Sequence, residues 1–146
     1  MRKDLPRRLL ILLLRLGAVM TGLAFLTVPL PVETMVSVHR WLGLGELPRA
    51  PIVEYLARSV SVFYGFHGVL LFLLSTNVDR FAPIITFVAV MNVLFGIVLI
   101  AIDVKAGLPA LWIAFEGPPV VLTGIALGLL NRAARKQAVS VESLTW

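Results

Sequence analysis

The stretch FAPIITFVAVMNVLFGIVLIAI, residues 81–102, contains no charged residue and decides the fold class. A transmembrane α-helix needs about 20 mostly apolar residues to cross about 30 Å of hydrocarbon, and this stretch is long enough. Lipid offers the backbone no hydrogen-bond partner, so we expect the segment to be an α-helix that spans a membrane.

Three further apolar stretches lie on either side of it. Together they place four membrane spans at about residues 9–30, 52–75, 81–102 and 109–131. The composition agrees, because 59% hydrophobic residues, 14% charged residues and a mean hydropathy of +0.95 are outside the range of soluble globular domains. We therefore expect an all-α membrane protein, in which one integral membrane domain forms an antiparallel four-helix transmembrane bundle.

Lysine and arginine are distributed unevenly between the two sides that these spans define. Eight lie on one side, namely Arg2, Lys3, Arg7, Arg8, Arg80, Arg132, Arg135 and Lys136, and only Arg40, Arg49 and Lys105 on the other. Positive charge favours the cytoplasmic side, so the pattern predicts that both termini are cytoplasmic. Lipid headgroups explain the net charge of +5 better than a nucleic acid does, and we expect no nucleic-acid partner.

The N-terminus also resembles a signal peptide, because a basic stretch precedes an apolar one. The apolar stretch is too long for a signal peptide, contains Arg15 and lacks an A-x-A-type site before Pro29. We expect the first span to be retained.

The long connection after the first span has an amphipathic pattern. Met35, Val38, Trp41 and Leu42 recur at helical spacing, which predicts a short interfacial helix within residues 32–44 on the outer surface. Gly43 and Gly45 are expected to end it. After the fourth span, residues 132–146 are expected to form a polar tail, or residues 133–139 extend the helix.

Glu54 and Arg58 lie four residues apart in the second span, so they share a helix face and can form an ion pair. Small residues continue this face, which indicates that it packs inside the bundle. Two interpretations are open. The pair either lines an outward-facing polar pocket or, as we favour, holds helices together.

The fourth span contains the unusual sequence WIAFEGPPVVLTG, residues 112–124. Pro118 and Pro119 remove two backbone donors, so two carbonyls before them lose their helical partners, as in the broken helices of transporters. In the alternative that we favour, the membrane helix starts at Pro118.

Glu116 lies at about the depth of Arg58 in either case. A charged residue at the centre of a membrane helix costs on the order of 2.5–3.5 kcal/mol, so a partner is needed. We predict that Glu116 pairs with Arg58, and that Asp103 either joins them or lies just above them. Glu54, Arg58, Asp103 and Glu116 are thus the candidate polar site or ion-pair network.

His67 lies on another face of the second span, at a depth comparable to that of Asn92. A second polar contact inside the membrane is therefore expected among His67, Asn92 and Tyr64. We favour a structural histidine over a haem ligand or a proton relay. Gly124 and Gly128 form a G-x-x-x-G pair, which is typical of close helix packing or of a dimer face.

Signatures of catalysis are missing from the sequence. It has no H-E-x-x-H, no G-x-S-x-G and no phosphate-binding glycine loop, and the absence of cysteine excludes thiolate chemistry. We expect a non-enzymatic protein with no cofactor and no metal site.

Residues 39–68, HRWLGLGELPRAPIVEYLARSVSVFYGFHG, and residues 101–119, AIDVKAGLPALWIAFEGPP, resemble a group of small uncharacterised four-span bacterial membrane proteins. More distantly, the size and layout are similar to those of DoxX-type proteins, some of which accompany quinone-linked oxidoreductases. The resemblance implies a bundle in a bacterial inner (cytoplasmic) membrane and transfers no site residue.

We therefore expect an accessory or interaction subunit in the lipid bilayer, whose partner is another membrane protein or a second copy. One alternative is a small ligand-binding or transport protein with an outward-facing polar site and an unknown ligand. A third is a subunit of a quinone-linked redox complex.

Overall fold

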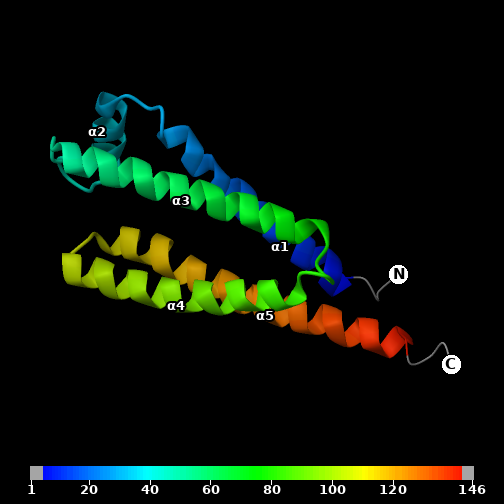
Figure 1. Cartoon of the computed structure of the whole chain (residues 1–146). Coiled ribbons are helices and arrows are strands. Elements are labelled where there is room, and N and C mark those ends of the chain that lie inside the picture. The colour runs from blue at the N-terminus through cyan, green and yellow to red at the C-terminus, as the bar shows by residue number, and fades with distance from the viewer. Residues whose placement is uncertain (1–4, 143–146) are drawn as a thin grey trace. The chain divides into compact units, whose positions relative to one another are not determined.

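The computed structural model describes residues 5–142 of the chain, with side chains for residues 5–137. Every regular element in that range is helical. The elements are α1 (Leu5–Gly22), the short 3-10 helix η1 (Leu23–Thr27), α2 (Val32–Trp41), α3 (Pro51–Thr76), α4 (Ala82–Ala106) and α5 (Ala110–Glu142) (Figure 1).

Four segments are long and apolar enough to cross a membrane. They are Leu5–Thr27, Pro51–Thr76, Ala82–Ala106 and Ala110–Gln137. The all-helical class and the four apolar helices are thus confirmed. The first segment is shifted toward the N-terminus, because α1 already begins at Leu5 and η1 ends it at Thr27, two residues before Pro29.

The interpretation that the last helix starts at Pro118 is wrong. Gly107, with a φ of 69°, ends α4 in the left-handed conformation, and α5 starts at Ala110 and runs through Pro118 and Pro119. The helix does not break at the prolines either. It continues because Gly117 and Gly124, on either side of them, both lie against α4.

The C-terminal part of the chain, where the sequence predicts a polar tail, is helical up to Glu142. α5 runs on to Glu142, so the alternative of an extended helix describes the structure over that range. Ala134 is buried beyond the predicted end of the span, which shows that packing continues there. Residues 143–146 of the predicted tail lie outside the described residues.

Internal contacts divide the chain into two units, residues 16–71 and residues 5–15 with 72–142. In the first unit, α1 and η1 run antiparallel to α3. Gly68 lies directly on the backbone of α1, where an added Cβ would be 2.7 Å from the carbonyl oxygen of Ala18. Farther along, the rings of Phe25 and Phe66 meet edge to face with their centroids 5.6 Å apart. Small residues on α3 therefore allow the close approach of the two helices.

In the second unit, α4 and α5 form an antiparallel hairpin (Figure 1). An added Cβ at Gly96 would lie 2.8 Å from the carbonyl oxygen of Gly117. The contacting positions recur every seventh residue along each helix, at 82, 89 and 96 in α4 and at 117, 124 and 131 in α5. Such a repeat keeps one face of each helix turned toward the other.

Candidate functional site

Arg58 is the centre of the polar contacts in the first unit. Its Nε and Nη2 donate to Oε1 of Glu54 at 3.0 and 2.7 Å, so the ion pair that the spacing indicates is present. Nη2 also donates to the carbonyl of Leu30 at 3.0 Å, and Nη1 donates to the carbonyl of Val28. One guanidinium therefore binds a carboxylate and two backbone carbonyls.

The local sequence explains why those carbonyls need Arg58. The last carbonyls of a helix have no partner within the helix, and Pro29 and Pro31 offer no backbone N–H. A cation is also favoured at the negative end of a helix. One turn farther along α3, the hydroxyls of Thr27 and Ser61 are hydrogen-bonded to each other at 2.7 Å. These contacts favour the interpretation that Arg58 holds the end of the first span against α3.

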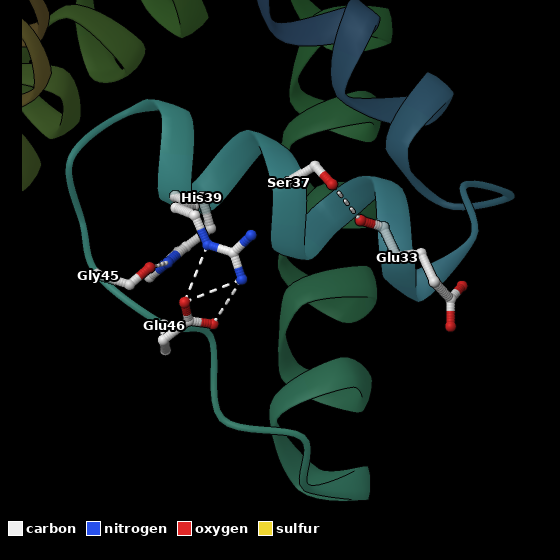
Figure 2. A network of polar contacts seen from close by, with 6 residues as sticks. Glu33, Ser37, His39, Gly45 and Glu46 are labelled. Atoms are coloured by element: carbon white, nitrogen blue, oxygen red, sulfur yellow. Dashed lines mark hydrogen bonds and ion pairs between the residues drawn. The ribbon is translucent and has the colours of Figure 1, made fainter.

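A separate polar network links the last turn of α2 to the connection that follows it. Figure 2 shows Glu46 beside the last turn of α2, where its two carboxylate oxygens accept from Nε and Nη2 of Arg40, both at 2.9 Å. His39 Nδ1 lies 3.1 Å from the carbonyl of Gly45. Gly43 and Gly45 have φ values of 75° and 83°, so the chain turns where the sequence predicts that α2 ends.

The Arg40–Glu46 contact changes the ionisation of both groups. The hydrogen bond from Arg40, together with its positive charge, holds the pKa of Glu46 below its ordinary value. The same contact raises the pKa of Arg40. Both side chains are exposed to solvent, so this network orders a surface connection and does not form an enclosed site.

Asp103 and Glu116 form a different kind of site in the second unit. Asp103 continues the seven-residue row of α4 that contacts α5, and it is only 3% exposed. Its Oδ2 is buried and has no hydrogen-bond partner within the described part of the chain. Glu116 of α5 lies within the range of electrostatic repulsion by Asp103, and the Trp112 side chain lies near Glu116.

Among the described residues of the same unit, no lysine or arginine forms an ion pair with these carboxylates. Lys105 is the nearest lysine or arginine in sequence, and it is exposed and forms no ion pair with any described residue. A buried charge without a partner is costly, and most buried polar atoms in native proteins do have one. The Asp103–Glu116 carboxyl pair therefore differs from the Glu54–Arg58 pair in lacking a counter-charge.

The four candidate residues thus form two pairs, Glu54 with Arg58 and Asp103 with Glu116. The predicted pair of Arg58 with Glu116 would join the two units, and it stays a prediction. Within its own unit, Arg58 already has three partners.

The second predicted contact also involves both units. His67 and Tyr64 belong to α3, while Asn92 belongs to α4. Within its own unit the His67 ring has no hydrogen-bond partner among the described residues. The contact among His67, Tyr64 and Asn92 stays a prediction, and so does the structural role of this histidine.

Asn131 is a buried polar residue whose contacts the sequence analysis missed. Its amide nitrogen donates to the carbonyl of Ala82 at 2.8 Å and to the hydroxyl of Thr86 at 2.9 Å. Asn131 lies seven residues after Gly124 and three after Gly128, so it shares their helix face. This spacing was the feature of the sequence that could have predicted a contact of Asn131 with α4.

Comparisons of this chain with protein families, with curated proteins and with solved structures find no match.

Proposed function

We propose that this chain is a small integral membrane protein that binds a monovalent inorganic cation of sodium's size at the Asp103–Glu116 carboxyl pair. This is the ligand-binding or transport class of the three expected from the sequence. The observation that supports it is the buried oxygen of Asp103, which has no partner among the described residues although the carboxylate of Glu116 lies within electrostatic range.

The position of Asp103 in α4 strengthens the case for a cation. It lies in the last turn before Gly107, where the helix dipole places partial negative charge. The helix dipole repels a carboxylate at that end. A cation, in contrast, is attracted both by the dipole and by the carboxylate. The C-terminal ends of membrane helices coordinate sodium in known transporters.

The number of available ligands favours a monovalent ion. Calcium requires six to eight oxygen ligands, and magnesium requires octahedral geometry. Residues 5–142 contain no group of three or more histidine, cysteine or acidic side chains that could hold a metal ion. Two carboxylates are better matched to an ion that is bound with fewer charged ligands.

The proposal includes a placement in the membrane. The four apolar helices form an antiparallel bundle with both termini in the cytoplasm, and α2 lies on the outer surface of a bacterial inner membrane. The uneven distribution of lysine and arginine supports this orientation. Asp103 and Glu116 then lie in the outer half, so the site is reached from outside.

Trp112 offers an optical test because it lies beside Glu116. In a background with Trp41→Phe and Trp146→Phe, Trp112 is the only tryptophan. Purified protein would be titrated with sodium chloride against N-methylglucamine chloride at constant ionic strength. We expect a saturable change in fluorescence, and an affinity at least about tenfold lower in Asp103→Asn and Glu116→Gln.

Glu33→Gln is the matched control, because Glu33 is an exposed acid outside the four apolar segments. It should bind sodium as the parent does. Circular dichroism would confirm that each variant keeps its helix content. A response that is absent from the parent, or equal in all variants, would contradict the proposal.

The accessory role is a second candidate, and one observation favours it. α5 presents a row of large exposed apolar side chains on the face turned away from α4, namely Leu111, Phe115, Leu122 and Leu129. A partner helix or a second copy could cover this row. Co-purification from native membranes tests it, because a stoichiometric partner lost in Phe115→Ala and Leu122→Ala would support the role, and its absence would contradict it. The quinone-linked role stays a prediction.

A further inference from the structure

A second polar region lies at the other end of the α4–α5 hairpin. There the hairpin carries an open pocket of about 570 Å³, lined by Thr86, Gly128, Asn131, Arg132, Arg135 and Lys136. All six residues belong to the same unit. From these residues we infer that the pocket binds the phosphate group of an anionic phospholipid.

The two helices pack less tightly at Gly128, which lines the pocket, than at Gly124. At Gly124, an added Cβ would lie only 2.7 Å from the backbone of α4, so the helices touch there. At Gly128, the nearest atom to an added Cβ is the Cβ of Ala89, at an ordinary contact distance of 3.7 Å. A methyl group therefore fits at Gly128, where it would clash at Gly124.

Two polar residues of the lining, Asn131 and Thr86, are held in fixed positions. Asn131 is only 2% exposed, and its amide donates to Thr86 and to the backbone of α4. The Thr86 hydroxyl in turn donates to the carbonyl of Ala82 at 3.0 Å. These hydrogen bonds hold both lining residues in place and leave recognition of a ligand to the charged side chains around them.

Three cations also line the pocket. Arg132, Arg135 and Lys136 are exposed, and none of them forms an ion pair with an acid in the described part of the chain. Asp79, an acid of the same unit, is already bound to Arg7 at 3.2 Å. The pocket therefore carries three positive charges, which suits a phosphate group.

The position of the cations favours a lipid over a dissolved anion. They follow the last apolar turn of α5, at the level where a membrane span meets the headgroups. Basic pockets between membrane helices on the cytoplasmic side are typical sites for anionic headgroups. Gly128 extends the lining of the pocket toward the apolar part of the helices.

Native mass spectrometry of the detergent-solubilised full chain tests the inference. Phosphatidylglycerol, phosphatidylcholine and inorganic phosphate would be added separately. We expect one phosphatidylglycerol to be retained in preference to phosphatidylcholine. At about 1 kcal/mol for each basic residue near a membrane surface, Arg132→Gln, Arg135→Gln and Lys136→Gln combined should weaken retention on the order of 100-fold.

Gly128→Leu is a second test, because it fills the pocket and keeps every cation. It should also lose the lipid. Arg49→Gln with Lys105→Gln is the charge control and should retain it, while circular dichroism checks that all variants are folded. No preference for phosphatidylglycerol, or equal loss in the control, would overturn the inference. Retention of inorganic phosphate without the lipid would overturn it too and would assign the pocket to a dissolved anion.

Discussion

Gly124 of α5 lies against the carbonyl group of Ala89 in α4, so closely that a Cβ at Gly124 would be 2.7 Å from that oxygen. With the contact of Gly96 and Gly117, it fixes how α5 lies along α4. The Asp103–Glu116 pair and the basic pocket lie on either side of these contacts. Helix packing in the hairpin therefore positions both proposed sites.

Gly124→Ala is expected to destabilise the hairpin by about 1–3 kcal/mol, because the added methyl group contacts backbone atoms that cannot move independently. Unfolding of the purified protein by denaturant in mixed micelles measures the loss. Gly128→Ala is the matched control, since its methyl group has room. Equal effects of the two substitutions would contradict the described packing.

Arg58→Ala is expected to cost about 1–3 kcal/mol, because it leaves a carboxylate and two carbonyls without their donor. Partial exposure of the pair keeps the value below that of a fully buried ion pair. Glu54→Gln should lower the free energy of unfolding by less, because Arg58 still donates to the carbonyls of Val28 and Leu30. The same unfolding assay compares the two.

A double-mutant cycle decides which carboxylate Arg58 depends on. We expect coupling between Arg58 and Glu54. A cycle between Arg58 and Glu116 tests the pair predicted from sequence, and stability restored by Glu116→Gln in the Arg58→Ala background would establish it. No coupling to Glu54 would contradict the observed ion pair.

Glu46 should titrate below its ordinary value of 4.5, because Arg40 stabilises the carboxylate. Because the pKa is lowered in the folded chain, the contact stabilises the folded connection at a pH above the ordinary pKa of Glu46. This stabilisation is lost as the pH falls through the lowered pKa. Carboxyl NMR follows this titration. Arg40→Gln should move the Glu46 midpoint back up toward 4.5, and an unchanged midpoint would count against the contact.

The membrane orientation can be tested with a reporter fused after Trp146. The distribution of lysine and arginine predicts that the reporter is active in the cytoplasm. The same reporter inserted between α2 and α3 should be active on the opposite side. Periplasmic activity of the C-terminal fusion would reverse the orientation and place the carboxyl pair in the inner half.

Hydropathy predicted the four long helices because the apolar stretches are long and are interrupted by charge or proline. It located their ends less well. Pro118 favours a helix start, but contacts of Gly117 and Gly124 with α4 hold the helix together through it. Residues after Arg132 look polar enough for a tail, yet burial of Ala134 shows that they still pack.

The candidate site was predicted in part. The i, i+4 spacing of Glu54 and Arg58 was enough to predict their pair. Spacing carries no information about the carbonyls of Val28 and Leu30, which Arg58 reaches because α1 and α3 pack together. The closeness of Asp103 to Glu116 likewise depends on the register of α4 against α5, which the glycine contacts set.

Direct binding of radioactive sodium to the purified chain tests the central claim, that the Asp103–Glu116 pair holds a cation. Equilibrium dialysis against a range of sodium concentrations gives the stoichiometry. We predict one saturable sodium ion per chain, retained in Glu33→Gln and lost when Asp103→Asn and Glu116→Gln are combined. No saturable binding to the parent, or the same binding to the combined variant, would contradict the account.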